Sequence, residues 1–178
     1  FANNTATGSQ GINVAQSSNN NTFRGNIVTG NSGAFNGINI DGASNNIIIN
    51  NTLNSKIAVV ITTGGFGVGS NNNFTNNTLI GDTGFEINWS TNILITNSYF
   101  QDVNWSIKTG LGSNVTLVDN ERLTNYTFAN APRTTIKKTG IAEVTFFNIV
   151  NANGTNLSQD VNLSVARNLH INTSRSPG

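Results

Sequence analysis

The feature that most constrains the fold is an internal repeat of about two dozen residues. A short apolar motif recurs around one Asn, and the recurring positions are Asn26, Asn51, Asn77, Asn97 and Asn120. The steps between them are 25, 26, 20 and 23 residues. Short apolar alternations separated by Asn- and Gly-rich turns, repeated at this period, are typical of a β-solenoid. The sequence therefore predicts an all-β fold, a right-handed parallel β-helix with Asn-rich turns.

Composition supports this prediction and limits the functions that fit. The side chains of Asn, Thr and Ser compete for backbone hydrogen bonds, and Gly loses the most backbone entropy in a helix, so these residues favour turns over helices. The chain has 17 charged residues and a net charge of +1, which gives no reason to expect nucleic acid as a partner. It has no Cys, and no apolar run is long enough for a membrane span. Because it opens at Phe1, we expect a mature exported protein or part of a longer one.

Stacked coils would place equivalent residues in columns along the axis. Two apolar columns are predicted to face inward: Ile12, Ile38, Val59, Phe85 and Trp105 form one, and Phe23, Ile48, Phe74, Leu94 and Leu117 form the other. The five repeated Asn residues are predicted to form an inward ladder. Each amide can then donate to the next along the axis, as in cross-β stacks.

Two segments carry a family resemblance. Residues 44–53 and 70–79 both read Ser-Asn-Asn, three further residues, then Asn-Asn-Thr-Leu. This pattern resembles the repeat of NosD-like periplasmic proteins, pectate-lyase-like enzymes and, most of all, archaeal cell-surface β-helix proteins. The resemblance extends over about residues 9–123. It implies the parallel β-helix fold and a place outside the cell or on its surface, but it does not imply an activity.

The repeat suggests a division of the chain at about residue 123. Residues 1–123 are predicted to form the coils, and residues 124–178 a looser continuation or a β-rich cap. Residues 1–120 carry a net charge of −2 and residues 121–178 a net charge of +3. Since an open solenoid exposes strand edges at its ends, we expect head-to-tail self-association or coverage by other segments of a longer chain.

One column of ionisable residues is a candidate for chemistry. The repeat alignment places Asn31, Lys56, Asp82 and Asp102 at equivalent positions. Stacked carboxylates of Asp82 and Asp102 would be a weak metal site or a pair for a retaining glycosidase. A surface ladder in which Lys56 offsets Asp82 explains the same pattern. We assign no catalytic residue and no cofactor.

Three other features have a plain structural explanation. His170, the only His, lies in an alternating strand, so no His-based metal site or Ser-His-Asp triad follows. The Gly-rich segment 64–69 lacks a following Lys and is predicted to be a loop. Trp89 and Trp105 both stand in Asn-Trp-Ser triplets; we expect Trp105 in the core and leave Trp89 open between core and surface.

The chain contains thirteen Asn-x-Ser/Thr sequons. In an exported protein, glycosylation is expected at turn positions, and the candidates are Asn73, Asn88, Asn104, Asn125, Asn153, Asn156 and Asn162.

These observations favour a non-catalytic structural or adhesive module of an extracellular surface protein, such as a surface layer or filament subunit. The alternative is a protein that binds or cleaves glycans. Ice binding is a third possibility, but the predicted Thr array of Thr52, Thr78 and Ser98 is short.

Overall fold

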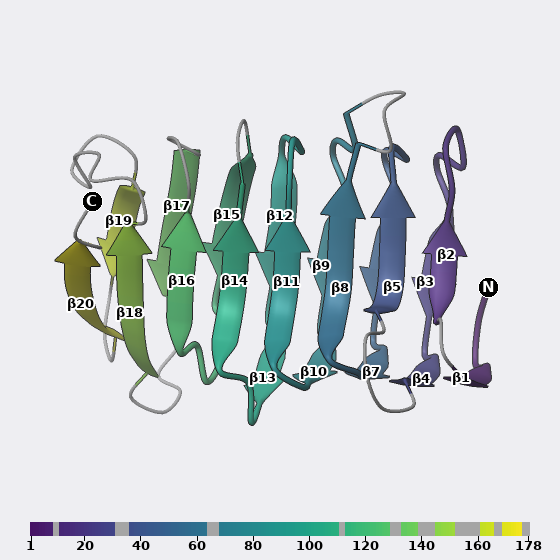
Figure 1. Ribbon diagram of the computed structural model, residues 1–178, viewed down its shortest axis with the longest axis horizontal. Helices are drawn as coiled ribbons and strands as arrows, with labels where there is room; N and C mark the ends of the chain where they lie inside the picture. The colour runs from purple at the N-terminus through teal and green to yellow at the C-terminus, as the bar shows by residue number, and fades with distance from the viewer. Residues whose placement is uncertain are drawn as a thin grey trace.

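The chain folds as a stack of parallel strands. The computed structural model describes the backbone of residues 1–8, 11–30, 36–63, 68–110, 113–128, 133–138, 145–151, 161–165 and 169–175, and side chains as far as Asn125. These residues form strands and no helix. Figure 1 shows the strands side by side along one axis, from the first strands of the chain at one end to the last strands at the other. The prediction of an all-β parallel β-helix is therefore confirmed.

Three parallel sheets build the stack. Sheet 1 contains β1 (Thr5–Gly8), β4 (Ile27–Gly30), β7 (Thr52–Asn54), β10 (Thr78–Ile80) and β13 (Tyr99–Gln101). Sheet 2 contains β2 (Ile12–Val14), β5 (Asn36–Asp41), β8 (Ile57–Thr62), β11 (Thr83–Ile87), β14 (Trp105–Thr109), β16 (Asn125–Phe128), β18 (Thr145–Asn151) and β20 (Leu169–Arg175). Sheet 3 contains β3 (Thr22–Arg24), β6 (Ile47–Ile49), β9 (Asn73–Thr75), β12 (Ile93–Thr96), β15 (Asn114–Val118), β17 (Arg133–Lys138) and β19 (Val161–Val165).

The coils change character along the axis. Each of the first five coils gives one strand to every sheet. Sheet 1 then ends at β13, and Glu121 of the next coil continues it only by a single bridge to Tyr99. Among the described residues, β16 to β20 extend sheets 2 and 3 alone.

The inward column of sheet 2 differs from the prediction at one end. Ile12, Ile38, Val59 and Phe85 are in register as expected, but the next member is Ile107 and not Trp105. Trp105 pairs with Thr83 and is only half-buried. In β14 the consecutive residues Ser106 and Ile107 are both buried, so the inward-outward alternation breaks there. A prediction that assumes strict alternation of inward and outward side chains cannot reveal such a break.

The inward column of sheet 3 contains one similar error. Phe23, Ile48, Phe74 and Leu117 are in register, and Ile95 takes the place predicted for Leu94. Leu94 is half-buried and pairs with Asn73. The reason is that β12 begins with three consecutive apolar residues, so its pattern does not distinguish the two faces.

Aromatic side chains from all three sheets meet in the core. Phe74 of β9 and Phe85 of β11 lie edge to face, with centroids 5.0 Å apart and an interplanar angle of 85°. The ring centroid of Phe100 in β13 lies 6.1 Å from that of Phe85. All three side chains are at most 1% exposed. Edge-to-face geometry is a favoured arrangement for such pairs, and this cluster joins the three sheets.

The predicted Asn ladder is present with one substitution. Asn26, Asn51, Asn77 and Asn120 are each 1% exposed, and Asn4 extends the ladder at its first coil. Asn97 is not a member, because it is exposed and has a φ of 47°. Ser98 takes its place: the backbone N–H of Asn77 donates to the Ser98 hydroxyl, and the backbone N–H of Ser98 donates to Asn120 Oδ1.

A second inward ladder was not predicted. The backbone N–H of Asn21 donates to Asn46 Oδ1 at 2.9 Å, and that of Asn46 donates to Asn72 Oδ1 at 3.0 Å. Asn46 and Asn72 are fully buried. In both ladders every bond between side chains of neighbouring coils runs from the earlier coil to the later one.

Candidate functional site

The two carboxylates proposed as a pair occupy different places in their coils. Asp82 immediately precedes β11 and is equivalent to Lys56 and Asn104 in the neighbouring coils, whereas Asp102 follows β13 and is equivalent to Gly81. The turn before β14 has three residues and the turn before β11 has two, so aligning the repeats placed Asp102 wrongly. The described residues contain no group of three or more His, Cys, Asp or Glu that fits a metal ion.

A solvent-open hollow lies at the start of three neighbouring strands of sheet 2. It has a volume of about 320 Å³. The first residues of β8, β11 and β14 line it, and these are Ile57, Thr83 and Trp105. The residues just before these strands, Lys56, Asp82 and Asn104, also line it. Lys108, further along β14, completes the lining. We call this hollow the Trp105 pocket.

Side-chain size along one column accounts for the hollow. Ile57, Thr83 and Trp105 are in register on successive coils. The small Thr83 stands between two larger side chains, which leaves space above it. Thr83 is 2% exposed, whereas Lys56, Asp82 and Asn104 at the rim are exposed.

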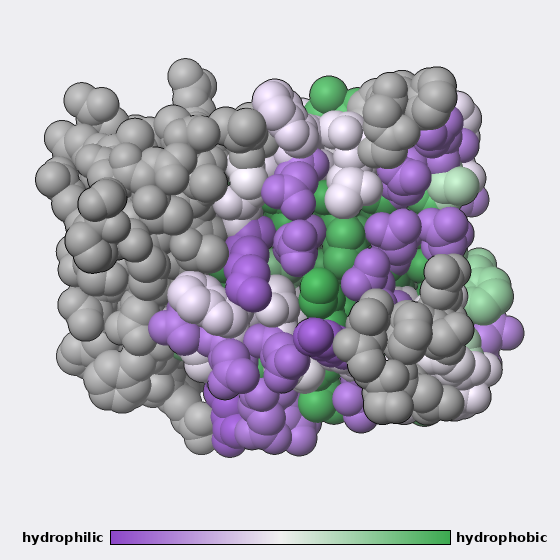
Figure 2. All heavy atoms as spheres, viewed as in Figure 1, coloured by the Kyte–Doolittle hydropathy of each residue, from purple (hydrophilic) through white to green (hydrophobic). Residues whose placement is uncertain are grey.

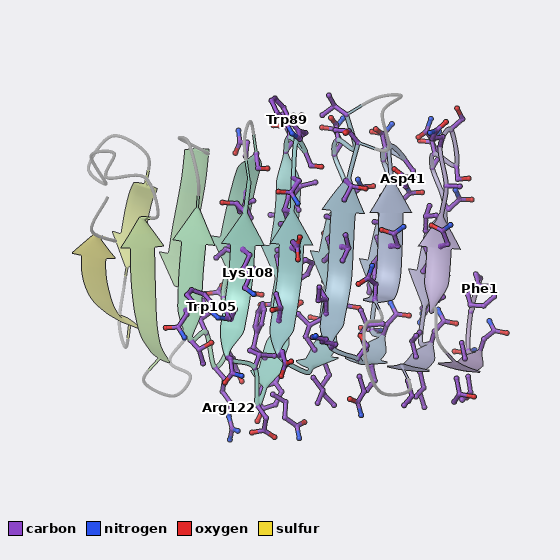
Figure 3. The ribbon with its side chains drawn as sticks, viewed as in Figure 1. Phe1, Asp41, Trp89, Trp105, Lys108 and Arg122 are labelled. Carbon is purple, nitrogen blue, oxygen red and sulfur yellow. The ribbon has the colours of Figure 1, made fainter. Side chains whose placement is uncertain are left out.

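Trp105 makes a cation–π contact with Lys108 of its own strand. Lys108 Nζ lies 5.5 Å from the centroid of the Trp105 ring, within the range of a cation–π interaction. Figure 3 shows both side chains on the same face of β14. In Figure 2 the described part of this face is largely hydrophilic, with a narrow apolar strip over β8.

The other tryptophan, Trp89, which the sequence left open between core and surface, lies at the surface. Trp89 is 53% exposed at the turn between β11 and β12, away from Trp105 (Figure 3). Its φ is 52°, a left-handed conformation that is unusual for a bulky residue. Asn occupies this conformation at many other turns of the chain, including Asn45, Asn71 and Asn92.

The candidate glycosylation sites differ in accessibility. Asn104 is exposed, whereas Asn73, Asn88 and Asn125 are half-buried. Asn73 Oδ1 accepts a hydrogen bond from the Thr75 hydroxyl of its own sequon, and Asn125 Nδ2 donates to the Asn104 carbonyl at 2.6 Å. Among these four, Asn104 is the most accessible to a modifying enzyme.

Several predicted residues lie outside the described part of the chain. Asn31, Asn153 and Asn156 are among them, as are residues 64–67 of the Gly-rich segment. The backbone of Asn162 lies in β19 and that of His170 in β20, but their side chains are not described.

The sequence did not reveal the Trp105 pocket. Only two of its residues, Lys56 and Asp82, were in the predicted column, and Trp105 was expected in the core. The signal that was present is the Asn-Trp-Ser triplet, which places a polar and an aromatic residue next to each other at a turn. No sequence pattern showed that Thr83 would lie beside Trp105.

Comparisons with known proteins identify the family. No helix among the described residues has the length and apolar character that a membrane span requires. Neither the comparison with curated proteins nor that with solved structures gives a match. A family model described as periplasmic copper-binding protein (NosD) matches residues 1–138, which is 138 of the 178 residues. The chain therefore belongs to the NosD family.

Proposed function

We propose that this chain is a non-catalytic structural or adhesive module of an exported surface protein, in a surface layer or filament. The observation that carries the proposal is the end of the stack. Strands β1, β2 and β3 are the first strands of the three sheets. Among the described residues, β1 and β2 each have a neighbouring strand on one side only, whereas Phe1 to Asn3 pair with the outer edge of β3. Unpaired strand edges bind further strands, so this end suits head-to-tail contact with a second copy or with another segment of a longer chain.

Side chains at this end support the same function. Ile12 and Ala6 are partly buried and pack against the core. Phe1 is 60% exposed and lies at the end of the molecule in Figure 3. An added coil would cover apolar surface at the same time as it pairs β1 and β2.

The copper of the family description does not fit this chain. Cu(I) is bound mainly by Cys and Met, and Cu(II) by His with other nitrogen or oxygen ligands. The sequence has no Cys, no Met and one His. This donor set does not suit a copper site formed by the chain alone. We therefore propose no copper function for it.

The family description does agree with export. It places the family in the periplasm, which fits the expectation of a protein outside the cytoplasm. Extracellular or cell-surface placement is the finer part of our proposal. A protein in that position meets other copies, other surface chains and glycans.

Electron microscopy of the native material, with immunogold labelling of cells, tests this function. We expect label on the surface and filaments or lattices in the purified material. Ile12→Lys should abolish assembly because it places a charge at the end of an apolar column. Asn13→Lys is the matched control, since Asn13 is exposed on the same strand. Unlabelled cells together with single monomers at every concentration would contradict the proposal.

A further inference from the structure

We propose that the Trp105 pocket binds a short neutral saccharide, which deepens the adhesive part of the proposed function and rests on it. The pocket volume of about 320 Å³ is at the lower end of the range for small-molecule sites. That size suits the end of a glycan chain, or a short branch, better than an extended polymer. Three successive coils contribute to it, so the register of the solenoid fixes its shape.

The polar groups of the pocket match a polyhydroxylated ligand. A sugar hydroxyl both donates and accepts hydrogen bonds, so its site needs groups of both kinds. Asp82 provides an acceptor, the lysine ammonium groups provide donors, and the Asn104 amide provides both.

The apolar groups match the other surface of the same ligand. A pyranose ring presents C–H groups on one face, and an aromatic ring is the usual platform for them because of its electron-rich face. Trp105 supplies an indole, and Ile57 supplies a further apolar contact. Trp105 is half-buried and Lys108 lies against its ring, so the indole loses little freedom on binding.

The rim is also fixed before a ligand arrives. The Asn104 carbonyl accepts hydrogen bonds from Asn125 Nδ2 at 2.6 Å and from the Thr124 hydroxyl at 3.2 Å. The backbone N–H of Asn104 donates to the Asp82 carbonyl. The turn that carries Asn104 is thus tied to the coils on both sides, and binding requires little rearrangement.

The charges favour a neutral ligand over an anionic one. Lys56 and Lys108 contribute two positive charges and Asp82 one negative charge. Glu86 is in register with Lys108 on the neighbouring strand and brings a second carboxylate close by. This balance provides no strong field for a polyanion such as a uronate polymer.

Trp105 fluorescence tests the proposal directly. Trp89→Asn leaves Trp105 as the only tryptophan, and unglycosylated protein keeps Asn104 free of an attached glycan. The probes are the hexamers of glucose (α-1,4 and β-1,4), N-acetylglucosamine and mannose, with hexagalacturonate as the anionic probe. We expect a saturable change with at least one neutral hexamer. Asn104→Ala in this background should weaken it about tenfold, as the loss of one hydrogen-bonding group predicts.

Isothermal titration calorimetry of the parent protein and of the Trp105→Ala and Trp89→Asn variants locates the site. Trp105→Ala should abolish binding, and Trp89→Asn should leave it unchanged. Three results would overturn the proposal: no binding of any neutral hexamer at millimolar concentration, binding of hexagalacturonate alone, or loss of binding on removal of Trp89 but not of Trp105. Electron microscopy of the Trp105→Ala protein distinguishes loss of saccharide binding from loss of assembly. Filaments that still form without saccharide binding would leave the structural role intact.

Discussion

The Oδ1 atom of Asn51 accepts two hydrogen bonds from Asn26 on the preceding coil, one from its backbone N–H and one from its side-chain Nδ2, both at 2.9 Å. Asn51 in turn donates to the carbonyl of Phe23 and to Asn77 Oδ1. The two side chains are 1% exposed. One amide thus satisfies groups on three coils, which makes the ladder a test of the fold.

Asn51→Ala should lower the free energy of unfolding by roughly 1–3 kcal/mol, since it leaves buried groups without partners. Asn50→Gly is the matched control, because Asn50 is exposed with a φ of 56° that Gly adopts readily. Denaturant unfolding followed by circular dichroism measures both. Equal destabilisation by the two variants would show that the inward amide is not the source of the stability.

Phe85→Ala should lower the free energy of unfolding by about 3–5 kcal/mol, because it removes the central ring of the cluster that joins the three sheets and leaves a cavity. Phe85→Leu retains more volume and should cost less. Thermal unfolding of both variants measures the difference. A loss below about 1 kcal/mol for Phe85→Ala would contradict the central place of this ring.

Gly81→Ala should destabilise the protein by more than about 1 kcal/mol, because Gly81 has a φ of 141° and an added Cβ would overlap the Ser55 carbonyl oxygen. Gly69→Ala is the control, since an added Cβ there meets its nearest atom, Ile61 Cγ2, at 3.3 Å. Chemical denaturation curves compare the two, and a Gly81→Ala protein as stable as the parent would show that the turn before β11 is built differently.

Trp89→Asn should preserve or raise the free energy of unfolding, by up to about 1 kcal/mol, because Asn tolerates the left-handed conformation better than Trp. The exposed indole has little packing to lose. Differential scanning calorimetry provides the measurement. A clear drop in melting temperature would mean that Trp89 makes stabilising contacts that its 53% exposure does not suggest.

Copper should change the melting temperature by less than about 2 °C, which is under 1 kcal/mol for a chain of this length. A ligand that binds the folded state stabilises it by mass action, so calorimetry with Cu(II), and with Cu(I) under reducing conditions, reveals a site. A saturable shift that disappears in His170→Ala would show that the single His does bind copper, against the expectation from the donor set.

The sequence predicted the solenoid because an apolar motif around one Asn recurs about every two dozen residues. In the structure this motif contains a turn residue followed by an inward polar side chain. Asn50 and Asn51 show this unit clearly: the first has a positive φ and is exposed, and the second is buried. The same reading applied to Asn45 and Asn46 would have revealed the second ladder. It would also have shown that Asn97 is the turn residue of its pair, so that Ser98 and not Asn97 faces inward.

The sequence did not predict the details that depend on turn length and on local bends. One additional residue before β14 moved Asp102 away from Asp82. Two consecutive buried residues, Ser106 and Ile107, turned Trp105 outward and opened the pocket. The spacing of the repeat shows neither the length of this turn nor the break in the alternation of β14.

The direction of the amide ladders has a consequence for growth. Because the amide-to-amide bonds of the two ladders run from the earlier coil to the later one, a further copy continues the column only in the same orientation. Any fibre extended in this way would be polar, with two chemically unlike tips that add subunits at different rates.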